Sequence, residues 1–158
     1  MQTALVDSSI DRNNIQTKQF TDQASAHFKK KLQWKLNILL AALECNVTIL
    51  YMDADIVLLK DPFPYLNSIQ RVHFLAQKDI TVCSGFMYLY LHNKTMQMID
   101  VARRIRNRVN GGDQGAILNV VSQMRIRHQL LRSDLFMSGE FFFSEYNYYW
   151  DKISIFVI

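Results

Sequence analysis

Residues 47–55 read VTILYMDAD, a strand-forming run that ends in two carboxylates. The first six residues are aliphatic, aromatic or β-branched, which predicts a short strand. Because the run is apolar on both faces, we expect a buried strand of the parallel kind that helices cover on both sides. Asp53 and Asp55 then follow at the carboxyl end of the strand, where ligands bind in sheets of this class.

A long helix is expected before this strand. Thr21 or Asp22 could cap its start, and Asn46 ends it. Its apolar positions fall on one face at helical spacing: Phe28, Leu32, Leu36, Leu39, Leu40 and Leu43. After the strand, Ile56 to Leu59 is apolar again, and Asp61-Pro62-Phe63-Pro64 predicts an extended or turning path.

The remaining pattern alternates strands and helices, which predicts one α/β layered domain over residues 1–158. Asp113 is predicted to cap the second of the two later helices, after the break at Asn110-Gly111-Gly112. The expected helices are 94–108 and 113–124. The expected strands are 72–76, 85–91, 126–131, 141–143 and 153–158.

Composition agrees with a folded domain and excludes disorder, since 49% of the 158 residues are apolar and 20% are charged. The net charge of +4 suits an anionic ligand. The arginines at 103, 104, 106 and 108 are expected on a solvated helix face, and no nucleic-acid motif accompanies them. We therefore expect no nucleic-acid partner.

Cys45 and Cys83 are expected to be buried thiols, although a disulfide between them stays open. No apolar run is long enough to span a membrane. The first residues do not resemble a signal peptide, so a targeting segment would lie outside this chain.

The pair Asp53 and Asp55 raises an electrostatic question. Two carboxylates one residue apart repel each other and are costly to remove from water. A divalent cation removes that cost, and oxygen ligands suit Mg²⁺ or Mn²⁺, which also bind phosphate oxygens. The simpler interpretation is a pair of solvated loop aspartates, with Asp53 capping a turn.

Two enzyme classes use such a pair. In haloacid-dehalogenase-like phosphatases the first aspartate is a nucleophile, but such an enzyme needs a later acidic pair that this sequence lacks. The flanks YMDADIVLLKDPFPYL (51–66) instead resemble the nucleotide-diphospho-sugar transferase family. Three later segments also resemble it in order and spacing: CSGFMYL (83–89), GGDQGAILN (111–119) and FMSGEFFF (136–143). The resemblance covers about residues 33–143.

This resemblance implies a GT-A-like, Rossmann-like fold with a mixed sheet flanked by helices, incomplete at both ends of this chain. It also implies a glycosyltransferase that uses Mn²⁺ or Mg²⁺ to move a sugar from a nucleotide diphosphate donor to a glycan or protein acceptor. The Asp-Gln pair at 113–114 is similar to that of glycogenin-like retaining enzymes, which implies retention. A Golgi-lumenal setting is implied as well. The alternative is an inactive nucleotide-sugar-binding domain derived from such an enzyme.

Site roles are implied in the same way. Asp53 and Asp55 would bind the metal, and Asp53 would also reach the donor. Asp113 would bind the donor sugar and act with Gln114 near the anomeric carbon. Lys35, Ser84 and Gly85 complete the expected donor-binding set. Lys35 could equally be an exposed helix lysine, and Ser84-Gly85 an exposed turn.

Overall fold

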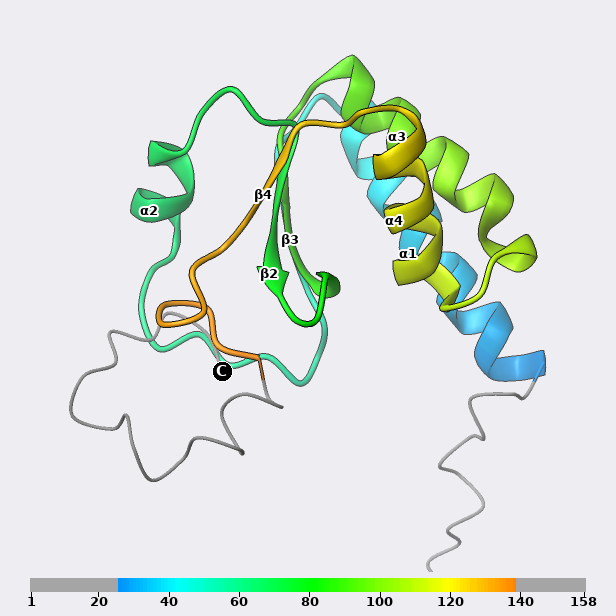
Figure 1. Ribbon diagram of the computed structural model, residues 1–158, viewed down its shortest axis with the longest axis horizontal. Coiled ribbons are helices and arrows are strands. Elements are labelled where there is room, and N and C mark those ends of the chain that lie inside the picture. The colour runs from blue at the N-terminus through cyan, green and yellow to red at the C-terminus, as the bar shows by residue number, and fades with distance from the viewer. Residues whose placement is uncertain (1–25, 139–158) are drawn as a thin grey trace, which may run out of the picture.

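The computed structural model describes the backbone of residues 26–138 and the side chains of residues 34–138. Its centre is a four-stranded sheet with strand order β1-β3-β2-β4 (Figure 1). The strands are β1 (Ile49–Met52), β2 (Phe74–Lys78), β3 (Val82–Leu89) and β4 (His128–Leu130). β3 runs antiparallel to both β1 and β2, whereas β4 is parallel to β2. The fold is therefore a mixed α/β sheet flanked by helices, as the sequence predicts.

Three helices lie together on one side of this sheet, and a short one lies on the other side (Figure 1). The three are α1 (Ala26–Glu44), α3 (Asn93–Ile105) and α4 (Gly112–Gln123). The short one is α2 (Phe63–Ser68), and a 3₁₀ turn, η2 (Arg106–Arg108), extends α3. α1 ends where Asn46 takes a φ of 61°, which confirms that residue as the end of the helix. The expected start at Thr21 or Asp22 lies outside the described residues.

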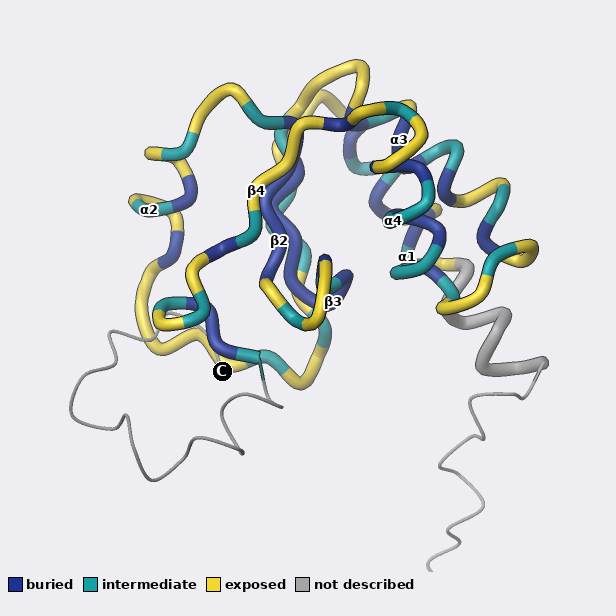
Figure 2. Tube along the Cα trace, viewed as in Figure 1, coloured by how far each residue is buried: buried dark blue, intermediate teal, exposed yellow. Residues whose placement is uncertain are grey.

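The strands bury both of their faces, and each face has its own core. Along β2, Phe74 and Ala76 pack towards α1, α3 and α4, while Leu75 packs towards the opposite side. Along β3, Met87 and Leu89 alternate in the same way with Phe86 and Tyr88. Figure 2 shows β2 and β3 as the most continuously buried segments. They form the buried centre of the sheet.

β1 differs from the expectation. It pairs antiparallel with β3, and its residues are half-buried, with Met52 exposed. The reason is its position, since β1 has only one strand neighbour within the described residues. An apolar run indicates a strand but does not indicate the direction of its partner. The expectation of a fully buried parallel strand is wrong.

α2 was also not predicted. Proline is tolerated in the first turn of a helix, where its missing N–H would have no partner. Pro62 and Pro64 occupy that turn, and the Asp61 carboxylate accepts a hydrogen bond from the Phe63 N–H at 2.9 Å. The stretch expected to be extended therefore starts a helix of six residues.

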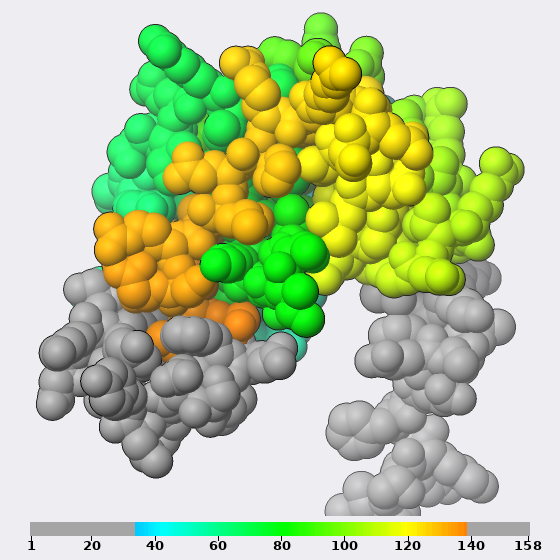
Figure 3. Space-filling view, viewed as in Figure 1, coloured from blue at the N-terminus to red at the C-terminus, as the bar shows by residue number. Residues whose placement is uncertain are grey.

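The chain after β4 returns to β2. The Leu131 N–H donates to the Ala76 carbonyl at 2.8 Å, and the Gln77 amide donates to the Met137 carbonyl at 2.6 Å. Figure 3 shows this segment, in orange, at the surface beside α2. The expected strands 141–143 and 153–158 lie outside the described residues.

Two further expectations need correction. Cys45 and Cys83 are both free, but Cys45 is exposed rather than buried, because it lies in the turn after α1. Arg103 and Arg104 lie on a solvated face, where both pair with Asp100, whereas Arg106 is buried. Between residues 26 and 138, no helix is long and apolar enough to cross a bilayer.

Candidate functional site

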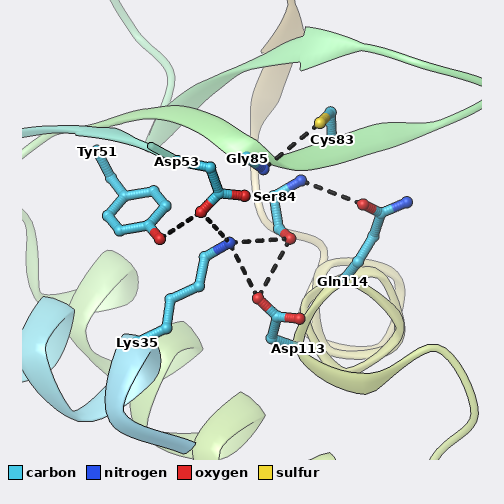
Figure 4. A network of polar contacts seen from close by, with 8 residues as sticks. All are labelled: Lys35, Tyr51, Asp53, Cys83, Ser84, Gly85, Asp113 and Gln114. Atoms are coloured by element: carbon cyan, nitrogen blue, oxygen red, sulfur yellow. Dashed lines mark hydrogen bonds and ion pairs between the residues drawn. The ribbon is translucent and has the colours of Figure 1, made fainter. Parts of the chain in front are cut away.

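The site lies where the carboxyl end of β1 meets the middle of β3 and the beginning of α4. The Asp53 N–H donates to the Gly85 carbonyl at 2.8 Å, which extends the β1–β3 pairing by one residue. This bond holds the Asp53 backbone beside β3. The Asp53 side chain is directed towards α1 and α4, as Figure 4 shows.

Lys35 is the central cation of the site. Its ammonium lies 3.0 Å from Asp113 Oδ2 and 3.4 Å from Asp53 Oδ1. It also donates to Ser84 Oγ at 3.3 Å. The side chain is only 8% exposed, so the interpretation as an ordinary exposed helix lysine is wrong. Burial is possible because two carboxylates compensate the ammonium.

Asp113 lies in the first turn of α4 but does not cap it. The cap residue is Gly111, in the left-handed region at φ 83°, and it makes no side-chain cap bond. Asp113 instead forms an ion pair with Lys35 and accepts a hydrogen bond from Ser84 Oγ at 3.3 Å. The cap prediction is wrong because the glycine backbone forms this helix start. A carboxylate in the first turn is still favoured by the helix dipole.

Ser84 and Gly85 lie inside β3 and are buried, so an exposed turn is also wrong. The Ser84 N–H donates to Gln114 Oε1 at 3.3 Å, which links β3 to α4. A Cβ on Gly85 would lie 3.0 Å from Asp53 Oδ2. Gly85 therefore gives the Asp53 carboxylate its space. The neighbouring Cys83 accepts the Gly85 N–H at 3.4 Å through sulfur.

Tyr51 was not predicted as part of the site. Its hydroxyl donates to Asp53 Oδ1 at 2.5 Å, and the Lys35 ammonium lies 4.6 Å from the centre of its ring. Burial, followed by the hydrogen bond to Asp53 and the nearby carboxylates, raises the pKa of Tyr51 well above its usual value. The hydroxyl therefore stays protonated as a donor. The signal was in the sequence, since residues two apart on a strand face the same side.

The structure thus brings six of the seven predicted site residues into one network: Lys35, Asp53, Ser84, Gly85, Asp113 and Gln114 (Figure 4). The seventh, Asp55, lies outside the network, on the exposed turn that follows Asp53. It makes no hydrogen bond or ion pair to another residue in the described part of the chain, and its charge reaches the site only through space, at Tyr51.

The charges of the site do not balance. Two carboxylates, of Asp53 and Asp113, contact the single ammonium of Lys35, and the exposed Asp55 adds a further negative charge that acts on Tyr51 through space. Asp53 is 43% exposed, and its Oδ2 has no hydrogen-bond donor among the described residues. Asp53 Oδ2 and the Asp55 carboxylate therefore fit the hard oxygen ligands that Mn²⁺ or Mg²⁺ requires. Residues 34–138 contain no cluster of three potential metal-binding side chains.

The sequence matches the model of the nucleotide-diphospho-sugar transferase family over residues 5–155. Since this match spans nearly the whole chain, the protein belongs to that family. Among solved structures, the glycosyltransferase GlyE of Streptococcus pneumoniae TIGR4 is similar, with a TM-score of 0.44 and 16% sequence identity. That match covers 64% of this chain but only 28% of the GlyE chain. No curated protein matches the sequence.

Proposed function

We propose that this chain binds a nucleotide diphosphate sugar together with Mn²⁺ or Mg²⁺ and transfers the sugar to a hydroxyl of a glycan or protein acceptor. The observation that carries the proposal is the charge imbalance of the site. An anionic diphosphate is repelled by carboxylates that no cation compensates. Asp53 and Asp55 would hold a divalent cation, whose charge would offset this repulsion and favour the binding of a diphosphate.

The residues divide into two groups in this proposal. Asp53 and Asp55 hold the metal, which when bound supplies Lewis-acid stabilisation of the departing diphosphate. Lys35, Ser84 and Gly85 lie on the donor side, where Gly85 leaves room for the Asp53 carboxylate. Membership of the family supports both a sugar donor and an acceptor.

Asp113 and Gln114 face the sugar. Each is anchored through one oxygen, Asp113 through Oδ2 and Gln114 through Oε1. The other oxygen of Asp113 and the amide nitrogen of Gln114 make no hydrogen bond among the described residues, so they can bind sugar hydroxyls. The C1–O bond to the diphosphate breaks, and the diphosphate keeps the electron pair. A C1–O bond to the acceptor forms with retention, and the acceptor proton passes to the diphosphate.

One observation favours a second candidate, a nucleotide-sugar-binding domain without turnover. Within the described residues, the two carboxylates have no third potential metal-binding side chain beside them. A metal held by two protein ligands depends more strongly on the diphosphate for its remaining coordination. Such a site can bind a nucleotide sugar with metal but turn it over slowly or not at all.

Isothermal titration with a panel of nucleoside diphosphates, with and without Mn²⁺, tests the proposal. Binding that requires Mn²⁺, together with slow hydrolysis of a matching nucleotide sugar, supports the transferase. Metal-dependent binding without any turnover supports the binding domain. Hydrolysis of a simple phosphate ester through a phosphorylated Asp53 supports the phosphatase alternative and overturns both.

We also propose a setting in the Golgi lumen or elsewhere in the secretory pathway, which the resemblance to transferases of that compartment supports. Protease protection of the tagged natural protein in isolated membrane vesicles tests it. Protection that is lost when detergent opens the vesicles is expected, and digestion in intact vesicles contradicts a lumenal location.

A further inference from the structure

Two donors hold the same oxygen of Asp53. The Tyr51 hydroxyl reaches Oδ1 at 2.5 Å, and the Lys35 ammonium reaches it at 3.4 Å. Oδ2 receives neither bond and faces Gly85, where an added Cβ would lie 3.0 Å away. The two oxygens of this carboxylate are therefore not equivalent, since Oδ2 alone has no hydrogen-bond donor among the described residues. Figure 4 shows this arrangement.

The two donors are not equivalent. Lys35 is shared by Asp53, Asp113 and Ser84, and it lies closer to Asp113, at 3.0 Å, than to Asp53, at 3.4 Å. Its four-carbon side chain is flexible, and a bound diphosphate offers it a competing partner. Tyr51 is a residue of β1, two positions before Asp53. Its rigid ring fixes the position of the hydroxyl.

The Asp53 backbone is fixed separately, by its N–H bond to the Gly85 carbonyl at 2.8 Å. Rotation of the side chain is then the freedom that remains. A carboxylate is free to turn about its terminal bond, where the torsional preference is broad. The hydrogen bond from Tyr51 removes this freedom.

We propose that Tyr51 is a positioning residue that holds Asp53 Oδ1 so that Oδ2 is presented to the metal and the donor diphosphate. This role rests on the proposed function, because it takes Asp53 as a metal ligand. The Lys35 ammonium lies over the Tyr51 ring, so the Tyr51 side chain also stabilises the Lys35 ammonium by a cation–π contact. In this proposal Tyr51 acts through Asp53 and is not itself a ligand of the metal or of the sugar.

Tyr51→Phe is the direct test, because it removes the hydroxyl and keeps the ring under Lys35. Tyr88→Phe is the matched control. Tyr88 lies on the neighbouring strand β3, and its hydroxyl donates to Asn67 at 2.6 Å on the other face of the sheet. Both variants lose one tyrosine hydrogen bond, but only the first loses it at Asp53.

Two measurements are made on the full chain. The first is the affinity for Mn²⁺ in the presence of a saturating nucleoside diphosphate that binds the wild type, followed by the electron paramagnetic resonance signal of free Mn²⁺. We expect Tyr51→Phe to weaken Mn²⁺ binding about tenfold or more and Tyr88→Phe to leave it within about twofold, since a lost hydrogen bond to a charged carboxylate is worth roughly a factor of ten or more. Equal Mn²⁺ affinity in Tyr51→Phe and wild type overturns the proposal.

The second measurement is a crystal structure of metal-free Tyr51→Phe, which reports on positioning even if the wild type binds no metal. We expect the Asp53 carboxylate to rotate so that Oδ2 no longer faces Gly85. An unchanged carboxylate contradicts the positioning role. A rotated carboxylate in a protein whose wild type binds no Mn²⁺ supports the positioning role and contradicts only the proposed function.

Discussion

The Lys35 ammonium lies 3.0 Å from Asp113 Oδ2 and joins helix α1 to the first turn of helix α4. Both side chains are nearly enclosed, with 8% and 11% of their surfaces exposed. The same ammonium also contacts Asp53 at the end of β1. One side chain therefore connects the two helices and the strand that carry the predicted site.

Lys35→Met should destabilise the protein because it leaves the Asp113 carboxylate buried without its cation. Breaking a buried pair from one side costs about 3 kcal/mol or more. Chemical denaturation measures the change. Lys60→Met is the control, since Lys60 is exposed and makes no hydrogen bond or ion pair among the described residues. In the double variant Lys35→Met with Asp113→Asn, much of the lost stability should return. Equal stabilities of the two lysine variants would contradict this account.

Two glycines in the first turn of α4, Gly112 and Gly115, should respond differently to alanine. A Cβ on Gly115 would lie 1.8 Å from the Asn110 carbonyl oxygen, so the backbone has to move. We expect Gly115→Ala to cost about 3 kcal/mol, the upper end for overpacking. Gly112 has free space around it but a φ of +60°, so Gly112→Ala should cost only about 1 kcal/mol of backbone strain. Thermal and urea denaturation compare the two variants, and the reverse order of stabilities would show that the first turn of α4 adapts easily to a larger side chain at Gly115.

His73 should make stability depend on pH. It is buried, and its Nδ1 accepts the Arg127 N–H at 3.0 Å. Burial, followed by the charges of His92, Arg127 and Lys94, lowers the pKa of His73 below its usual value. The unfolded chain therefore binds the proton more readily than the folded one. The stabilising contribution is complete above about pH 6.5, the usual histidine value, and declines as the pH falls below it.

His73→Asn tests this pH dependence, because an asparagine oxygen can accept the Arg127 N–H without titrating. When the pH is lowered from 7 to 5, the urea midpoint of unfolding should fall more for the wild type than for His73→Asn. His128→Asn is the control, as His128 is exposed on β4. If the urea midpoint of the wild type falls no more than that of His73→Asn, the pH dependence of stability comes from other groups.

Much of the fold was predictable because its signals are local. The apolar period of α1 and the turn at Asn46 mark one helix, and the glycine break at 110–112 separates α3 from α4. The direction of β1 was not predictable, since antiparallel pairing with β3 depends on contacts far along the chain. Pro62 and Pro64 predict an extended or turning path, but a proline also suits the start of a helix, which is where the structure places both.

The sequence predicts which residues form the site, but not which hydrogen bonds and ion pairs join them. Motif resemblance selected Lys35, Asp53, Ser84 and Asp113, which the structure brings within hydrogen-bonding distance of one another. The assignment of Asp113 as a helix cap followed a correct local rule, but Lys35 offers its carboxylate a stronger partner. Tyr51 was treated only as a strand residue because its hydroxyl partner is revealed by geometry.

Asp55 and Asp61 provide the clearest separation of function from stability. Asp55 is exposed and makes no hydrogen bond or ion pair to another described residue, so Asp55→Ala should leave the free energy of unfolding nearly unchanged. Under the proposed function it should abolish Mn²⁺-dependent binding of a nucleoside diphosphate. Asp61 accepts the Phe63 N–H at the start of α2, so Asp61→Ala should cost about 1 kcal/mol of stability. Because Asp61 is not part of the site network, the Asp61→Ala variant should bind the nucleoside diphosphate as the wild type does. Titration calorimetry measures the affinity of each variant for the nucleoside diphosphate with Mn²⁺, and urea denaturation measures the free energy of unfolding of each. Equal affinities of Asp55→Ala and Asp61→Ala would show that Asp55 is not a metal ligand.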